Sequence, residues 1–139
     1  MFEYKTQEQI NIANSIKKLL DKHLDDRSFE NIQKIEFPIK LFKALADLGL
    51  AGLAISEEHG GIAAGPITQM VVMEALAYRD LGPAIFISVH SMVSKLIEQF
   101  GNPAQKKKWL PKLAAGEFVA AFALTEANAG SDARSLNTT

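Results

Sequence analysis

The residue types best suited to hold a ligand gather in one stretch near the end of the 139-residue sequence, from Phe122 to Asp132. An alternating apolar run, Val119 to Leu124, leads into a polar loop that begins with the hydroxyl of Thr125. Small residues, here Gly130 and Ser131, allow close backbone approach, and successive N–H groups form an anion-binding nest. Because such residues also cluster in ordinary turns, composition alone favours a turn over a ligand site.

Three other polar features give weaker signals. The run Lys106–Lys108 could contact a phosphate or an acidic partner, although a solvated helix face is the commoner meaning of such a run. His90 lies on an apolar stripe, which predicts a packed and hydrogen-bonded core residue. His59 is followed by two glycines and is expected in a turn.

The roles of three serines and one glutamate stay open. Ser88, Ser91 and Ser94 crowd one predicted helix, where small hydroxyls could leave space beside a ligand or could lie on the surface. Glu74 falls within an apolar stripe, where an edge position is commoner than a buried carboxylate. The sequence shows no Ser-His-Asp arrangement, phosphate-binding P-loop or pair of catalytic carboxylates.

The composition excludes several classes of function. The chain has no cysteine, which rules out disulfides, thiolate metal sites and thiol nucleophiles. Its three histidines lack ligand spacing, so no metal site is expected. The net charge of −1 gives no electrostatic reason to bind nucleic acid or an anionic membrane. The sequence shows neither a signal-peptide core nor an apolar run of the ~20 residues that a membrane span needs, so we expect a cytoplasmic protein.

Five helices are expected in the first 117 residues. The first begins at the capping box that Thr6 and Gln9 can form and runs to about His23. The second begins near Pro38 and ends at Gly49. Their apolar stripes contain Ile12, Ile16, Leu19, Leu20, Leu41, Phe42, Leu45 and Leu48.

The remaining helices are separated by glycine, proline and asparagine. A third helix is expected from Pro66 to the break at Gly82-Pro83, and a fourth over residues 86–100. The fifth has Asn102 as its N-cap and ends near Gly116. Their stripes contain Ile67, Met70, Val71, Glu74, Ala77, Phe86, Val89, His90, Val93, Leu96, Ile97, Phe100, Trp109, Leu110 and Leu113.

The pattern therefore predicts an all-α fold, an up-and-down helical bundle followed by one orphan strand or loop. Residues 50–61 are expected as a buried connection that ends in a turn, and only Val119–Thr125 has the alternation of a strand. A lone strand cannot satisfy its own backbone groups. We expect it to pack on the bundle or to pair with a second copy up to about Thr125, and we expect an irregular tail from Glu126 to Thr139.

The sequence Phe122-Ala-Leu-Thr-Glu-Ala-Asn-Ala-Gly-Ser-Asp132 resembles the flavin-binding signature of the acyl-CoA dehydrogenase family. In that signature an aromatic residue and two small or apolar residues precede Thr-Glu-Pro-x-Ala-Gly-Ser-Asp. Three further blocks resemble the family in the same order: the glycine-rich Leu48–Gly61, Glu74–Tyr78, and Gly101–Glu117. The chain departs at Ala127, where the family usually has proline, and this departure puts loop rigidity in doubt more than flavin binding.

The resemblance implies an enzyme of three domains. Residues 1–117 would be its N-terminal helical domain, and residues 118–139 the truncated start of its middle β-domain. In the family the flavin lies between the middle and C-terminal domains, and the acyl chain enters beside the N-terminal helices. The 139 residues alone are expected to be inactive, and relatives are usually homotetramers.

The resemblance also implies which residues bind FAD. Phe122 would lie near the isoalloxazine and the substrate, and backbone groups of Leu124 and Thr125 would hold the flavin ring. Gly130 and Ser131 would serve the pyrophosphate, and Ser131 would also approach the acyl-CoA thioester. Donors aimed at a flavin that gains electrons stabilise the developing negative charge.

No residue of this chain is assigned a catalytic role. The family's catalytic carboxylate comes from the C-terminal domain, so none of Glu57, Glu58, Glu74 and Glu98 is nominated. The implied reaction is α,β-dehydrogenation of an acyl-CoA, with hydride passing to flavin N5 and an electron-transfer flavoprotein reoxidising the flavin. An acyl-CoA oxidase or a flavin-dependent monooxygenase on the same scaffold is an alternative. A helical interaction module without chemistry is another.

Overall fold

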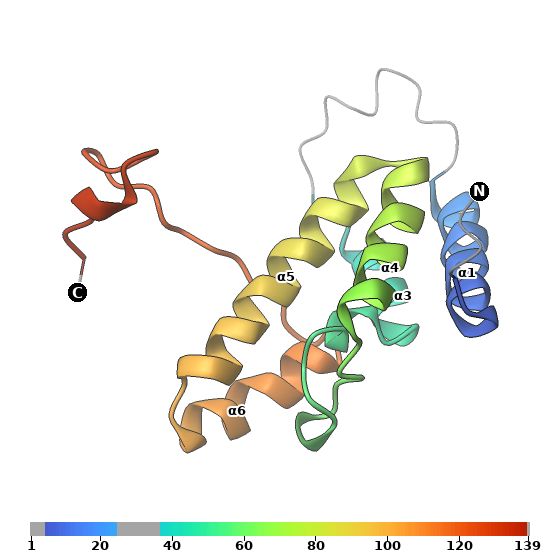
Figure 1. Cartoon of the computed structure of the whole chain (residues 1–139), viewed down its shortest axis with the longest axis horizontal. Coiled ribbons are helices and arrows are strands. Elements are labelled where there is room, and N and C mark those ends of the chain that lie inside the picture. Colours follow the sequence, from blue (N-terminus) through green and yellow to red (C-terminus); the bar gives the residue numbers. More distant parts are fainter. Residues whose placement is uncertain (1–4, 25–36, 139) are drawn as a thin grey trace.

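Every regular element of the computed structural model, which describes residues 5–24 and 37–138, is a helix. The α-helices are α1 (Gln7–His23), α3 (Ile39–Asp47), α4 (Pro66–Arg79), α5 (Leu81–Phe100) and α6 (Pro103–Ala114). Short 3-10 helices are η1 (Leu50–Gly52), η2 (Glu57–His59) and η3 (Ala133–Ser135). Helices α1, α4 and α5 lie side by side, and α6 packs against α5 (Figure 1). The expected all-α bundle is confirmed. No helix of the described residues is long and apolar enough to cross a membrane.

Two helices begin at capping boxes, of which the sequence predicted the one at Thr6 in full and only the N-cap of the one at Asn102. The Thr6 hydroxyl accepts the Gln9 backbone N–H at 3.2 Å, and the Gln9 side-chain oxygen accepts the Thr6 N–H at 3.0 Å. At α6, Asn102 and Gln105 make the same reciprocal pair at 2.9 and 2.8 Å. Each box satisfies two N–H groups that a helix N-terminus otherwise leaves without partners.

The boundary between α4 and α5 differs from the prediction. The dipeptide Gly82-Pro83 does not end a helix; it lies in the first turn of α5. Helix α4 ends at Arg79, and the Asp80 carboxylate accepts the Gly82 N–H at 2.7 Å as the N-cap of α5. Proline is tolerated there because the first turn of a helix needs no N–H donor. Helix α5 therefore starts at Leu81, five residues before Phe86.

Several predicted stripe residues are exposed. On α4, Met70 is 72 % exposed and Ile67 and Ala77 are also at the surface, whereas Val71, Val72, Ala75 and Leu76 are buried. Phe100 at the end of α5 is 73 % exposed, and Leu48 after α3 is exposed as well. The buried face of α4 is rotated because this helix packs between α1 and α5.

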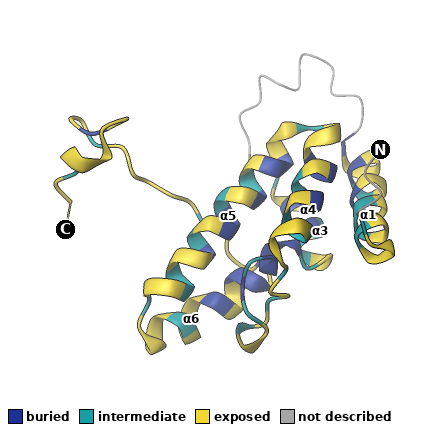
Figure 2. Ribbon diagram, viewed as in Figure 1, coloured by how far each residue is buried: buried dark blue, intermediate teal, exposed yellow. Residues whose placement is uncertain are grey.

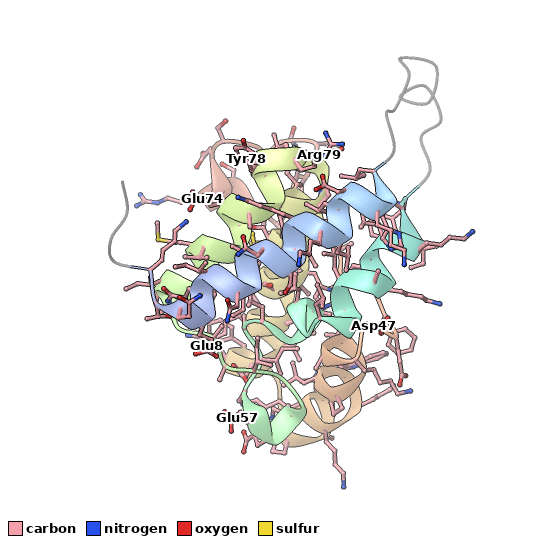
Figure 3. The ribbon with its side chains drawn as sticks, turned by 90° about the vertical axis from the view of Figure 1, so that its right-hand side faces the viewer. Glu8, Asp47, Glu57, Glu74, Tyr78 and Arg79 are labelled. Atoms are coloured by element: carbon pink, nitrogen blue, oxygen red, sulfur yellow. The ribbon has the colours of Figure 1, made fainter. Side chains whose placement is uncertain are left out.

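Ion pairs join the outer face of α4 to α1 and to the residue Lys5 before it. The Lys5 ammonium lies 2.6 Å from the Glu74 carboxylate, and the Arg79 guanidinium lies 3.1 Å from Asp21. Figure 3 shows Glu74, Tyr78 and Arg79 along this face of α4. Glu74 thus takes the edge position that is commoner for a glutamate within a stripe.

Two apolar clusters form the interior (Figure 2). The larger joins α1, α3, η1, α4 and α5, with Phe42 at 0 % exposure and its ring 6.0 Å from that of Phe86. The smaller lies under α6 and contains Ile55, Leu110, Leu113 and Ala114. Residues 50–61 contribute side chains to both clusters: Leu50, Ala51 and Leu53 belong to the larger and Ile55 to the smaller. The predicted buried connection is therefore confirmed.

The C-terminal segment differs from the prediction. Residues 119–125 belong to no strand, and packing ends at Ala120 rather than near Thr125. Beyond that point the chain runs away from the helices (Figure 1), with the side chains of Phe122 and Leu124 each 45 % exposed. Residues 119–125 have the alternating apolar pattern of a strand. A strand also needs backbone hydrogen bonds to a neighbouring strand, and the described residues supply none.

A glycine ends α6 where no other residue fits well. Gly116 has φ +68°, and a Cβ at this position would lie 2.3 Å from the Ala46 Cβ. We predict that Gly116→Ala lowers the free energy of unfolding by about 2–4 kcal/mol, through left-handed strain plus overpacking. Urea unfolding followed by circular dichroism measures it. Gly60→Ala is the control, because φ is +83° there but the nearest neighbouring atom lies 3.9 Å away. Equal losses in the two variants would contradict the clash with Ala46.

Candidate functional site

A groove of about 810 Å³ runs between α4 and α5. Helix α4 contributes Pro66, Gln69, Met70 and Met73, and α5 contributes Ser88, Ser91, Met92, Lys95, Leu96 and Gln99. Ala54, from the connection after η1, also lines the groove. The volume lies within the range of small-molecule sites, and most of the lining is apolar. The groove can therefore take an extended apolar group.

The chemistry of the lining suits an adaptable apolar ligand. Three of the four methionines of the chain, Met70, Met73 and Met92, line the groove. Methionine side chains are flexible and polarisable, so they adjust to ligands of different shape. Two small serines on the α5 side, Ser88 and Ser91, leave the space open.

The three serines of α5 have different surroundings. Ser88 and Ser91 line the groove, whereas Ser94 is fully buried and its hydroxyl donates to the His90 carbonyl at 2.8 Å. The Ser91 hydroxyl oxygen is buried and has no hydrogen-bond partner among the described residues. Only two of the three serines therefore stand beside a possible ligand.

Glu98 pairs with Lys95, which is one of the residues that line the groove. Glu98, 15 % exposed, accepts the Ser56 N–H at 2.8 Å and the Lys95 ammonium at 2.7 Å. Burial acts to raise the pKa of Glu98, but the hydrogen bonds from Lys95 and Ser56 outweigh it and lower the pKa to about 2. Glu98 is thus a charged brace between α5 and the start of η2, and it holds Lys95 at the groove.

The residues predicted to contact a flavin lie on the segment that leaves the bundle. Phe122 and Leu124 are half-exposed and Thr125 is exposed. In the described part of the chain, the backbone N–H groups of residues 121–125 donate no hydrogen bond. Free donors at close spacing are what a ligand with several acceptors needs. The groove lining includes neither Phe122 nor Ser131, so the structure does not bring these two predicted substrate contacts to the groove.

The polar loop after this segment is held by one carboxylate. Glu126 accepts the N–H groups of Asn137 at 2.9 Å and Thr138 at 3.0 Å, and also the Thr138 hydroxyl. These hydrogen bonds, led by that from the hydroxyl, lower the pKa of Glu126. Glu126 and Ala129 also exchange backbone hydrogen bonds. The tail has no strand, as expected, but it closes on itself rather than being irregular throughout.

Gly130 and Ser131 lie exposed inside this closed loop. Nothing lies within 4 Å of a Cβ built on Gly130, and its φ is outside the left-handed region. The glycine is thus not required by the fold of the loop. It leaves the backbone open to close approach from outside, which is the property that the sequence suggested.

The other nominated residues take structural or surface positions. His90 is buried and hydrogen-bonded, as predicted, and His59 lies in η2 before Gly60 at φ +83°. Glu57 and Glu58 are exposed on the same short helix. The described residues contain no group of three or more histidines, aspartates and glutamates that could hold a metal ion.

The lysine run faces solvent on α6. Lys107 and Lys108 are exposed, and the Lys108 ammonium lies 4.4 Å from the centre of the Trp109 ring. Lys106 is half-buried, so two of the three lysines have the solvated position that the sequence favoured.

Comparisons with known proteins give a consistent result. Residues 6–117 match the family "Acyl-CoA dehydrogenase, N-terminal domain". An acyl-CoA dehydrogenase of Bacillus subtilis is 34% identical over 135 residues, which cover 96% of this chain and 36% of that protein. The butyryl-CoA dehydrogenase structure from Megasphaera elsdenii has a TM-score of 0.82 at 33% identity, covering 96% of this chain and 36% of the other.

A third similar protein is an acyl-CoA dehydrogenase from Bacillus anthracis, whose structure contains FAD. It has a TM-score of 0.83 at 33% identity, covering 98% of this chain and 24% of that one. The chain therefore spans between a quarter and about a third of the length of these relatives.

Replacing Glu98 should weaken the fold in a pH-dependent way. Its pKa is about 2 in the folded chain against an ordinary 4.5, so its contribution is complete above pH 4.5 and is lost as pH falls toward 2. We predict that Glu98→Gln lowers the free energy of unfolding at pH 7 by about 1–3 kcal/mol, the usual value of hydrogen bonds to a charged group. Urea unfolding at a series of pH values should show the two proteins converging below pH 4.5.

The matched control is Glu57→Gln, since Glu57 is exposed and makes no such bonds in the described residues. It should leave stability within about 0.5 kcal/mol of the parent. If the difference in unfolding free energy between Glu98→Gln and the parent persists unchanged at pH 2.5, the ionised Glu98 carboxylate does not stabilise the fold as proposed.

Proposed function

Because this chain belongs to the acyl-CoA dehydrogenase family, we propose that it is the N-terminal portion of a flavin-dependent acyl-CoA dehydrogenase. Residues 1–117 are the helical domain, and residues 118–139 begin the flavin-binding middle domain. The observation that carries the proposal is the apolar groove between α4 and α5, on the same bundle that the unpaired segment 121–125 leaves.

The groove supplies the substrate side of the proposal. An acyl chain is apolar and flexible, and the lining of Met70, Met73, Met92 and Leu96 buries such a chain without demanding one shape. Burial contributes about 0.8 kcal/mol for each CH₂ group removed from water. The polar thioester end of the substrate then extends from the groove toward the flavin.

The segment after Ala120 supplies the cofactor side. When bound, FAD accepts the hydride that leaves the β-carbon of the acyl group. Leu124 and Thr125 offer backbone groups without partners, and Phe122 offers a half-exposed ring for the flat flavin. Gly130 and Ser131 offer an open backbone to the pyrophosphate, and Ser131 also serves the thioester end. The catalytic carboxylate lies outside this chain, so the 139 residues alone are inactive and bind flavin weakly.

Family resemblance underlies two further parts of the proposal, a homotetrameric assembly and an electron-transfer flavoprotein that reoxidises the flavin. The cytoplasmic location stays an expectation from the sequence. Formation of hydrogen peroxide during turnover, in place of a reduced electron-transfer flavoprotein, would indicate the oxidase alternative instead.

The groove can be tested directly through its methionines. We predict that acyl-CoA thioesters, from butyryl- to palmitoyl-CoA, shift the ¹³C-methyl NMR signals of Met70, Met73 and Met92 in the 139-residue chain. Free coenzyme A should leave these three signals unchanged, because it lacks the apolar chain.

A blocking substitution sharpens this test. Ser88→Trp places a large ring in the groove from an exposed position and should weaken acyl-CoA binding about tenfold or more, since 1.4 kcal/mol is a factor of ten. Ser15→Trp, at an exposed position of α1, is the matched control and should bind normally. Equal affinities of the two variants would place the acyl chain elsewhere.

The flavin loop can be tested in the natural full-length protein. Gly130→Val should reduce flavin occupancy more than Ala127→Pro, because a branched side chain obstructs close approach to the backbone. The thermal unfolding of the 139-residue chain should not change with Gly130→Val, since the position is open. Proline at 127 restores the family pattern and should be neutral or stabilising by up to about 1 kcal/mol. Equal flavin retention by the two full-length variants would make Gly130 an ordinary turn residue.

A further inference from the structure

His90 is a fully buried ionisable side chain that the proposed function does not use. It lies on α5, and its ring packs edge-on against Phe42 with 5.2 Å between ring centroids. Its Nε2 lies 3.1 Å from the Leu113 carbonyl oxygen of α6, and its Nδ1 lies 3.1 Å from the Ala120 backbone nitrogen. One ring thus connects α5, the end of α6 and the segment that follows.

The two partners determine where the ring carries its proton. The Leu113 carbonyl can only accept, so Nε2 must be the donor, and the Ala120 N–H can only donate, so Nδ1 must be the acceptor. The neutral imidazole with its proton on Nε2 satisfies both. Burial lowers the pKa of His90, which keeps this neutral form at neutral pH.

The bond to Ala120 is the last hydrogen bond between the bundle and the C-terminal segment in the described residues. Ala120 packs on the cluster under α6, whereas residues 121–125 are exposed and donate no hydrogen bond. Phe122 follows two residues later. The position and direction in which this segment leaves the bundle are therefore determined at His90.

We propose that His90 is a positioning residue that sets the flavin-contacting segment at a defined place relative to the groove. The same helix carries His90 on one face and Ser88, Ser91 and Met92 on the face that lines the groove. Because one rigid helix holds both, the acyl group and the segment from Phe122 to Thr125 keep a constant relation. This role rests on the proposed function, but the hydrogen bond itself does not.

Two substitutions separate the two bonds of the ring. The Asn side-chain oxygen stands near the position of Nδ1, so His90→Asn can still accept from Ala120. The longer Gln side chain reaches the position of Nε2, so His90→Gln keeps the bond to Leu113 and loses the one to Ala120. His90→Phe keeps the bulk of the ring and loses both. Losing the bond from His90 costs the Leu113 carbonyl little, because this carbonyl also accepts the Gly116 N–H at 3.1 Å.

The first measurement is made on the 139-residue chain without flavin. The ¹⁵N NMR shifts of His90 should show a protonated Nε2 and an unprotonated Nδ1 at pH 7. The Ala120 amide should exchange with solvent about tenfold faster in the Gln and Phe variants than in the parent, and at nearly the parent rate in the Asn variant. Equal exchange in all three variants, or a proton on Nδ1, would overturn the proposal.

The second measurement is flavin occupancy and the visible flavin spectrum of the natural full-length protein. His90→Asn should keep both, while His90→Gln and His90→Phe should reduce occupancy even where their melting temperatures equal that of the Asn variant. If Phe is tolerated best, the residue serves only packing and the positioning role is wrong. A parent protein that binds no flavin would overturn the proposed function and this role with it, while the Ala120 exchange result would still report on the bond.

Discussion

The structure depends on helix α5 being buried on several sides at once. It packs against α4, α6 and η1, and it contributes Ala84 and Ile87 to the main core. A helix in this position cannot shift without disturbing the groove on one face and His90 on another. Interiors are packed so closely that such elements hold discrete positions. The rigidity of α5 is therefore what gives both candidate binding regions a common frame.

Features of the helices that depend on adjacent residues were predicted well. Features that depend on packing between distant segments were predicted less well. The capping box at Thr6 and the N-cap at Asn102 depend on adjacent residues, so they could be identified before the structure. The start of α5 was missed, because Gly82-Pro83 resembles a helix break whereas the Asp80 side chain caps the helix just before it. The buried face of α4 depends likewise on two neighbouring helices, which no local pattern specifies.

The candidate site shows the same division. The open backbone around Gly130 follows from residue types that are adjacent in the chain, and the sequence could nominate it. The groove could not be found in that way, because its two walls come from separate helices and its serines had two equally good interpretations. The strand predicted at 119–125 failed for a related reason: alternation describes side chains, whereas a strand exists only through a partner's backbone.

In the described residues the C-terminal segment is tied to the bundle at its start, and its far end closes on itself. Its start is tied to the bundle through His90 and Ala120, and its end is closed by Glu126 on Asn137 and Thr138. Binding costs less entropy when the ligand-contacting residues are already restrained, yet their donors must stay free for the ligand. Residues 121–125 meet the first condition at their start, where Ala120 is tied to His90, and the second throughout, because their own N–H groups have no partners in the described chain. A bundle that paired this segment fully would gain stability and lose the surface that we propose for the flavin.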